Sequence, residues 1–298
     1  MPDLPKSNAT IYTSSSYGGS IRMKTLLLGG QAVPLLGQGT WNIGDSAIMR
    51  ATEIATLRRG IECGMTLIDT AEMYGSGRSE DLVGEAIACM RDRVYLVSKV
   101  LPSNASFEGT VRACEASLKR LRTDVIDLYL LHWRGRYALH ETVRGFERLV
   151  EQGKIRAWGV SNFDVDDMEE LFATPGGTAC AANQVLYNPE HRGIEYDLLP
   201  WCRQNAVTVM AYSPVGQGGR LLASAALRRV AEKHGISAAR VSLAWCLRQS
   251  VLAIPKASSI RHVEENAAAA GMELDAEDLA TIDKAFPPPK RKQSLDML

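Results

Sequence analysis

The chain contains eight short, β-rich runs of apolar residues spread along most of its length. Near-continuous apolar runs of this kind are typical of strands buried on both faces of a parallel sheet. The eight predicted strands cover residues 35–39, 66–69, 94–99, 125–132, 157–161, 180–184, 207–212 and 252–256.

Amphipathic helical patterns lie between most of these runs. Ile54, Leu57 and Ile61, for example, recur at the spacing of one helix face. Helices are predicted at residues 53–63, 79–90, 107–121, 139–152, 225–234, 238–248, 262–270 and 276–285.

The alternation of strands and helices predicts an α/β protein, a single (β/α)8 TIM barrel. Eight such units in about 260 residues match the size of that fold, and a doubly wound open sheet is the alternative. Residues 25–35 form a predicted β-hairpin, since Gly29 and Gly30 can supply the positive φ angles of a two-residue turn. We expect this hairpin to cap the bottom of the barrel.

The interior shows no linker and no break in composition, so we expect one barrel domain over residues 24–298. Residues 1–23 are rich in Ser, Gly, Asn and Thr and are predicted to be a flexible N-terminal tail. Three prolines at 287–289 stop the last helix, and residues 290–298 are expected to be a loose end.

The balance of charge and the spacing of the cysteines give no indication of a nucleic-acid, membrane or metal-binding function. Lys and Arg balance Asp and Glu at 34 each, which gives no indication of a nucleic-acid or membrane partner. The 6 cysteines show no C-x-x-C spacing, so no metal site is predicted and reduced core thiols are expected. With neither an apolar span nor a hydrophobic signal core, a cytoplasmic location is expected. The oligomeric state stays open and is compatible with a monomer.

Polar and titratable side chains end almost every predicted strand. In a TIM barrel the carboxyl ends of the strands form the active face. The residues placed there are Thr40, Asp69, Lys99, His132, Ser161, Asn162, Gln184, Tyr212 and Lys256.

Four of the residues near this face suggest proton transfer. Asp69 and Lys99 end neighbouring strands and are expected to form an ion pair, over which Tyr74 can fold. The cation lowers the pKa of the phenol, while burial raises it. His132 can hydrogen-bond the same oxygen and orient it. Each residue alone has a purely structural interpretation, but the four together predict a catalytic site.

Short motifs in a fixed order give a family resemblance. They are DTAEMYG from Asp69, SK from Ser98, LHW from Leu131, GVSNF from Gly159, NQ from Asn183, AYSP from Ala211 and IPK from Ile254. From about residue 25 to residue 285 the chain resembles the aldo-keto reductases. The short segments after His132 and Tyr212 are similar to the prokaryotic branch, which includes the 2,5-diketo-D-gluconate reductases.

The resemblance implies an NADPH-dependent oxidoreductase that reduces aldehydes and ketones to alcohols by hydride transfer, keto-sugars and keto-acids such as 2,5-diketo-D-gluconate among them. Tyr74 would be the general acid, Lys99 and Asp69 would tune it, and His132 would position the carbonyl. The implied substrate pocket is lined by Trp41, Tyr74, His132 and Trp133.

The resemblance also implies the cofactor contacts, in a chain without a G-x-G-x-x-G fingerprint after a strand. Gly37 and Gly39 are instead interpreted as sites of close backbone approach at the barrel rim. The implied NADPH contacts are Thr40, Trp41, Ser161, Asn162, Gln184, Tyr212, Ser213, Val215, Lys256, Ala257, Ser258, Arg261, His262, Glu265 and Asn266.

One position departs from the family pattern. The family commonly has arginine six residues after the lysine, where this chain has His262 and places Arg261 one residue early. A neutral imidazole is a weaker phosphate ligand than a guanidinium fork. We therefore expect a modest preference for NADPH, with NADH as the alternative cofactor.

Other interpretations stay open. Some family members serve chiefly as slow cofactor-binding subunits of membrane channels. A barrel with Lys99 as Schiff base would be an isomerase or aldolase. Arg134, Arg136 and Arg220 either attract an anionic substrate or are solvated loop charges.

Overall fold

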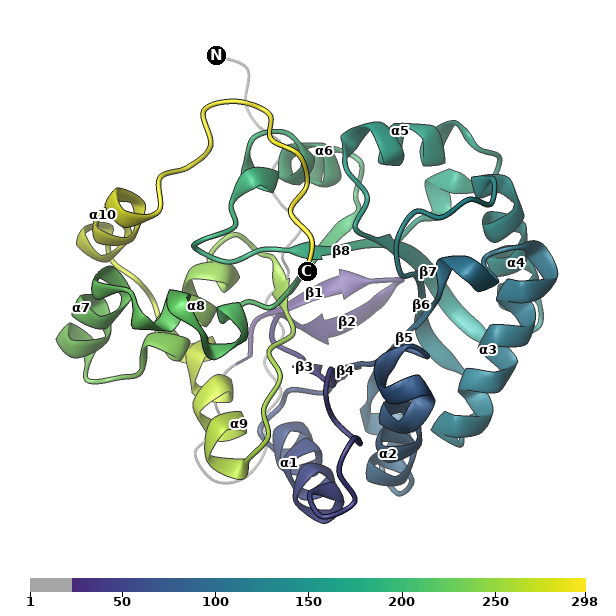
Figure 1. The fold of residues 1–298 in the computed structure, drawn as a ribbon, viewed down its shortest axis with the longest axis horizontal. Coiled ribbons are helices and arrows are strands. Elements are labelled where there is room, and N and C mark those ends of the chain that lie inside the picture. The colour runs from purple at the N-terminus through teal and green to yellow at the C-terminus, as the bar shows by residue number, and fades with distance from the viewer. Residues whose placement is uncertain (1–22) are drawn as a thin grey trace.

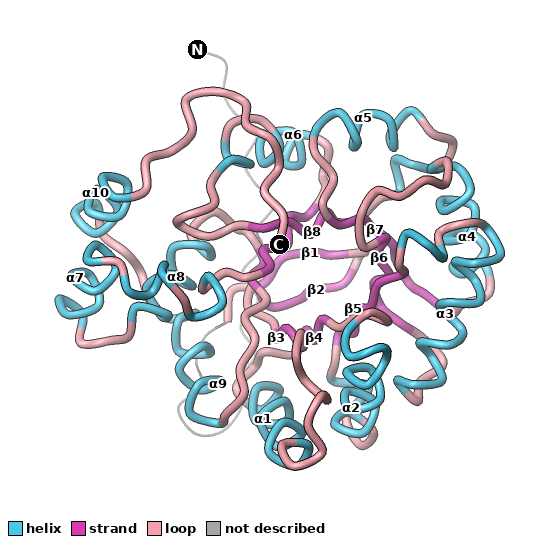
Figure 2. The backbone as a smooth tube through the Cα atoms, viewed as in Figure 1, coloured by secondary structure: helices cyan, strands magenta, loops and turns pink. Residues whose placement is uncertain are grey.

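Eight parallel strands curl into a closed ring in the computed structural model, which describes residues 23–298. Neighbouring strands follow chain order, and parallel bridges from Leu36 to Ala253 and from Gly39 to Lys256 join the first strand to the last. Figure 2 shows the strands surrounding one opening. This closure confirms the (β/α)8 barrel and excludes the open sheet. The strands are β3 (Gln38–Gly39), β4 (Leu67–Asp69), β5 (Tyr95–Val100), β6 (Ile126–Leu131), β7 (Ile155–Ser161), β8 (Ala182–Leu186), β9 (Thr208–Tyr212) and β10 (Leu252–Ala253).

The ring closes at Gly39. Its backbone N–H donates to the Pro255 carbonyl at 3.0 Å. A Cβ atom at this position would stand 2.7 Å from the Ile254 carbonyl oxygen, so only glycine lets the two strands approach this closely. The predicted close approach of backbone at the rim is confirmed.

The hairpin β1 (Thr25–Leu28) and β2 (Gln31–Pro34) closes the amino-terminal end of the barrel (Figure 1). Gly29 and Gly30 have φ angles of 57° and 81°, as the predicted tight turn requires. Leu28 and Val33 are buried in the cluster of side chains that fills the barrel interior. The predicted hairpin cap is therefore confirmed.

Helices surround the strands (Figure 1), and their apolar faces supply the outer core. Most agree with the predicted spans to within a few residues. The helices are α1 (Arg50–Glu62), α2 (Arg78–Ile87), α3 (Phe107–Leu121), α4 (Leu139–Glu151), α5 (Val165–Ala173), α6 (Leu198–Gln204), α7 (Ala225–His234), α8 (Ala238–Leu247), α9 (Ile260–Ala267) and α10 (Ala276–Ala285). Within residues 23–298 no helix combines the length and the apolarity needed to cross a membrane.

Two helices, α5 and α6, were absent from the predictions. Both are short, at nine and seven residues, so they carry little periodic signal. The start of α5 does have a local signature, because Asp164 and Asp167 form a reciprocal capping box.

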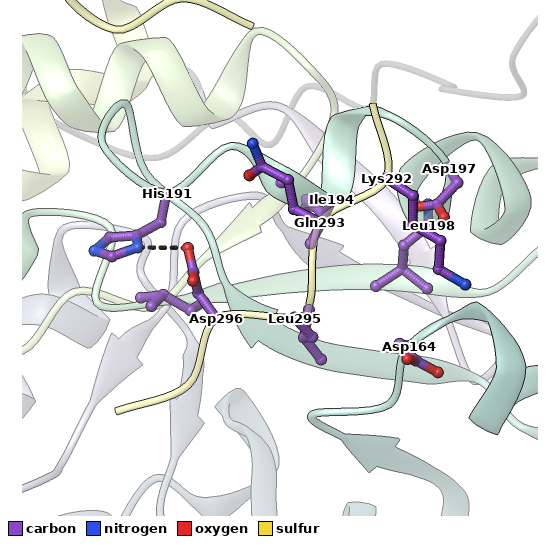
Figure 3. Close-up of a pocket in the computed structure, with 11 residues that line it drawn as sticks. Asp164, His191, Ile194, Asp197, Leu198, Lys292, Gln293, Leu295 and Asp296 are labelled. Atoms are coloured by element: carbon purple, nitrogen blue, oxygen red, sulfur yellow. Dashed lines mark hydrogen bonds and ion pairs between the residues drawn. The ribbon is translucent and has the colours of Figure 1, made fainter. Parts of the chain in front are cut away.

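The C-terminal end is not loose, and the expectation for residues 290–298 was wrong. Lys292 Nζ lies 3.0 Å from Asp166 Oδ1, and Asp296 Oδ2 lies 2.8 Å from His191 Nδ1 (Figure 3). The segment runs without regular secondary structure to a terminus marked over the barrel opening in Figure 1. Of the predicted N-terminal tail, only Met23 falls among the described residues, and it packs against the core.

Substitution of Gly39 by alanine tests the barrel closure. The added methyl group would force β3 away from β10, and we expect a loss of about 1–3 kcal/mol in the free energy of unfolding. Urea denaturation measures it. Gly271→Ala is the control, since a Cβ there meets no atom within 4 Å. Equal stability of the two variants would contradict the close approach.

Candidate active site

The four predicted titratable residues meet at the carboxyl ends of β4, β5 and β6. Asp69 ends β4, Lys99 lies near the end of β5, and His132 directly follows β6. Tyr74 begins the turn after β4. Lys99 and Asp69 are 0% and 2% exposed, so the ion pair is fully removed from water.

The Lys99 ammonium group donates three hydrogen bonds. Its Nζ lies 2.7 Å from Asp69 Oδ2, 2.9 Å from the Thr70 carbonyl oxygen and 3.2 Å from Tyr74 Oη. An ammonium has three protons to donate, so this set satisfies it completely. The cation is thereby held beside the phenol oxygen.

Burial and charge compete for the proton of Tyr74. Burial raises the pKa of the Tyr74 phenol, the Lys99 cation lowers it, and the net direction is upward. Burial by itself would lower the pKa of Lys99, but the Asp69 carboxylate and Tyr74 outweigh burial, and that pKa is also raised. At neutral pH the phenol is therefore protonated and hydrogen-bonded to a cation, which is the state that a general acid requires.

His132 is neutral in this environment. It is 7% exposed, and burial together with the nearby Lys99 charge lowers the pKa of its imidazole to about 3. Its ring lies 5.8 Å from the Tyr74 ring, centroid to centroid. Within residues 23–298, Nδ1 has no hydrogen-bond partner. A neutral imidazole so placed can orient a carbonyl oxygen without adding charge.

The turn that carries Tyr74 depends on residues that the sequence analysis did not single out. Gly75, Ser76 and Gly77 have φ angles of 56°, 54° and 91°. Gly77 lies against the Arg120 side chain, and Arg120 Nε donates to Glu80 Oε2 at 2.6 Å. The available signal was the Gly-Ser-Gly sequence, which is typical of left-handed backbone.

The side chains predicted to hold the nicotinamide lie on the opposite half of the ring. Tyr212 Oη donates to Asn162 Oδ1 at 2.9 Å, and Ser161 Oγ donates to the Gln184 carbonyl oxygen at 2.8 Å. Burial raises the pKa of the Tyr212 phenol to about 12. The structure thus brings all four into one connected network.

The Gln184 side chain also forms a hydrogen bond with Asp69, on the side of the barrel opening that carries Tyr74 and Lys99. Its Nε2 donates to Asp69 Oδ1 at 2.7 Å, between two residues that are 115 positions apart. No sequence pattern indicated this bond.

The remaining cofactor and substrate candidates on the barrel rim differ in accessibility. Thr40 is fully buried, and its Oγ1 donates to the Asp69 carbonyl oxygen and accepts from Ser79. Trp41 is 44% exposed, and Trp133 is half-buried against His132. Ser213 has a φ angle of 48°, and Val215 packs on the core just beyond it.

The predicted phosphate segment lies around the start of α9. Lys256 follows β10 and is exposed, and the Ser259 hydroxyl caps α9 by accepting from the His262 N–H. The amino end of a helix and an adjacent lysine form an anion-binding environment. Arg261 and His262 are exposed, Ser258 and Glu265 are half-buried, and Ala257 and Asn266 are buried.

Two of the three arginines considered for an anionic substrate are ion-paired within the protein. Arg134 Nη2 lies 2.7 Å from Glu170 Oε1, and Arg220 Nε lies 2.8 Å from Glu190 Oε1. The Arg136 guanidinium lies over the Tyr137 ring at 5.5 Å. The arrangement favours the interpretation of these arginines as loop charges.

Comparisons with known proteins agree with this geometry. A model of the Aldo/keto reductase family matches residues 35–286. The methylglyoxal reductase YeaE of Escherichia coli (strain K12) is 56% identical over 275 residues, 91% of this chain and 97% of that protein. The glyoxal reductase of Bacillus subtilis (strain 168) is 36% identical over 89% of this chain and 93% of its own length. A crystal structure of an aldo/keto reductase from Klebsiella pneumoniae, in complex with NADP and acetate, superposes with a TM-score of 0.91. It is 53% identical over 93% of this chain and 100% of that chain.

The depressed pKa of His132 predicts a pH-dependent stability. Because the unfolded imidazole takes up its proton near its ordinary pKa and the folded one only near 3, acid favours the unfolded state below about pH 6.5. One such group costs up to about 1.4 kcal/mol per pH unit. Replacing His132 by asparagine should therefore make the loss of unfolding free energy between pH 7 and 5 about 1–2 kcal/mol smaller, as measured by urea denaturation. The exposed His140→Asn variant should keep the wild-type slope.

Proposed function

The chain belongs to the aldo/keto reductase family, and we propose that it is an NADPH-dependent reductase of small dicarbonyl compounds such as methylglyoxal. The 56% identical relative is named for methylglyoxal, and the 53% identical structure holds NADP. The observation that carries the proposal is the 3.2 Å contact between Lys99 Nζ and the protonated Tyr74 hydroxyl.

We assign the proton transfer to Tyr74. The substrate carbonyl oxygen would accept hydrogen bonds from the Tyr74 hydroxyl and from the neutral His132 imidazole. NADPH, when bound, supplies the hydride. As negative charge develops on the carbonyl oxygen, Tyr74 gives up its proton, and the phenolate that remains is stabilised by Lys99. Asp69 keeps Lys99 charged throughout.

The donor set fits a dinucleotide. Amide and hydroxyl groups of Ser161, Asn162 and Gln184 would hold the nicotinamide carboxamide, and the Tyr212 ring would stack on the nicotinamide. Lys256 and the amino end of α9 would hold the 2′-phosphate. Ser161 ends β7, Asn162 follows it and Gln184 lies in β8, across the ring from β4, whereas Lys256 bridges to Gly39 on β3, the neighbour of β4.

The pocket favours a small neutral substrate over a keto-sugar acid. Trp41 and Trp133 offer apolar walls, and Arg134 and Arg220 are already paired with glutamates. We therefore propose methylglyoxal, and not 2,5-diketo-D-gluconate, as the substrate. All six cysteines are free, as suits a reducing compartment, and we infer a cytoplasmic enzyme.

Reduction of methylglyoxal tests the proposal directly. Wild type should oxidise NADPH in the presence of methylglyoxal faster than with 2,5-diketo-D-gluconate. Tyr74→Phe should lower kcat by about 10²–10⁴-fold and keep cofactor affinity nearly unchanged. The exposed Tyr196→Phe variant is the control. Cofactor binding without turnover of any carbonyl by the wild type would support a regulatory binder instead.

The proposed phosphate site predicts a change in cofactor choice. Lys256→Ala should weaken NADPH binding by about 10–100-fold and leave NADH binding almost unchanged, because NADH has no 2′-phosphate. His262→Arg should increase the preference for NADPH. Titration of both cofactors at fixed ionic strength measures this, with the exposed Lys284→Ala as control. An equal loss for both cofactors in Lys256→Ala would contradict the placement.

A further inference from the structure

A hydrogen bond spans the barrel opening between Gln184 and Asp69. Asp69 ends β4 and Gln184 lies in β8, which are the second and sixth strands of the eight-stranded ring and therefore face each other. The distance from Nε2 to Oδ1 is 2.7 Å, and both residues are 2% exposed. The bond joins the half of the opening that carries Tyr74 to the half that carries the predicted cofactor ligands.

This bond determines which way the Gln184 amide points. An ionised carboxylate only accepts hydrogen bonds, so Gln184 must turn its NH2 group toward Asp69. The other Asp69 oxygen is occupied by Lys99 Nζ at 2.7 Å. The Gln184 Oε1 atom is thereby directed away from Asp69 and remains available as an acceptor.

Gln184 and Asn162 differ in whether the side-chain amide oxygen is already hydrogen-bonded. Asn162 Oδ1 already accepts from the Tyr212 hydroxyl. Among the residues that the structure describes, no donor is bonded to Gln184 Oε1. Of these two amide oxygens, the one on Gln184 is the acceptor open to a carboxamide NH2 group.

We propose that Asp69 positions the cofactor through Gln184, by holding the amide so that Oε1 accepts from the nicotinamide carboxamide. Asp69 then has two roles: it forms the ion pair with Lys99, and it orients the Gln184 amide that binds the nicotinamide. The inference rests on the proposed function, since it presumes a bound nicotinamide. A carboxamide held with its NH2 toward β8 has one allowed orientation, and the ring attached to it presents one face to the substrate.

Gln184→Glu turns this bond into one that depends on pH. A protonated glutamic acid can donate its O–H to Asp69 and still offer its C=O to the carboxamide, as glutamine does. Once ionised, the introduced glutamate would place two carboxylates in contact in a buried site, which also raises the pKa of the new side chain. The variant should therefore resemble wild type in acid and fail in mild alkali.

Four of the titratable groups around the bond have pKa values shifted away from that interval, and the fifth, Asp69, is common to the variant and wild type. The pKa of His132 is lowered to about 3, and that of Tyr212 is raised to about 12. The pKa values of Lys99 and Tyr74 are raised further above neutrality. Burial raises the pKa of the Asp69 carboxyl, while the Lys99 cation and the Gln184 hydrogen bond act in the opposite direction, and the net direction is upward. Measuring wild type at each pH accounts for titration of this shared group. A pH-dependent difference between the variant and wild type then reports on position 184.

The experiment measures the Kd of NADP⁺ by quenching of tryptophan fluorescence at about pH 5.5 and pH 8. Relative to wild type, Gln184→Glu should bind within about 3-fold at the lower pH and at least about 10-fold more weakly at the higher pH. Gln184→Met, which has similar size and no amide, should bind about 5–10-fold more weakly at both. Wild type at each pH accounts for titration of the 2′-phosphate itself.

Gln38→Glu is the matched control. Gln38 is also a buried glutamine in a barrel strand, but its amide donates to the Leu57 and Met65 carbonyl oxygens away from the opening. This variant should lose stability without acid rescue of NADP⁺ binding. A constant ratio between Gln184→Glu and wild type at the two pH values overturns the inference, as does wild-type affinity in Gln184→Met. Failure of wild type to bind NADP⁺ overturns the proposed function, and this inference with it.

Discussion

The buried ammonium group of Lys99 is the constraint on which the rest of the site depends. An isolated charge in the interior costs several kcal/mol, so it is stable only where every proton finds a partner. Asp69, the Thr70 carbonyl and Tyr74 supply those partners within 3.2 Å. The ladder between β4 and β5 places Asp69 beside the strand that carries Lys99, and the turn after β4 brings Tyr74 to the same ammonium group. Tyr74, the proposed general acid, is held in place because its hydroxyl accepts one of the three hydrogen bonds that the buried Lys99 ammonium donates.

The barrel makes this arrangement rigid. Gly39 lets the first and last strands close, and the hairpin residues Leu28 and Val33 seal the opposite end. A closed ring leaves no free edge, so the strand ends cannot shift independently. The polar groups at the carboxyl ends are therefore held at fixed separations. Such preorganisation is what electrostatic catalysis requires, because the donors need not move as charge develops.

The two halves of the opening have separate chemical characters. One half carries the ion pair, the phenol and a neutral imidazole. The other carries amides, a hydroxyl and an aromatic ring suited to a nicotinamide. The Gln184–Asp69 bond connects them, and the C-terminus lies over the same opening in Figure 1. Cofactor orientation and proton donation are thus built on shared contacts.

The fold class and the identity of the proposed catalytic residues could be predicted from the amino-acid sequence. Strand and helix periodicity are local properties, and in a closed parallel barrel every strand end falls on one face, so Asp69, Lys99 and His132 could be placed together from their positions alone. The quantities that depend on distance and burial became known from the folded chain. Burial outweighs the Lys99 charge at Tyr74, His132 stays neutral, and residues 290–298 are held by ion pairs. The bond from Gln184 to Asp69 joins residues 115 positions apart, and no local pattern encodes such a separation.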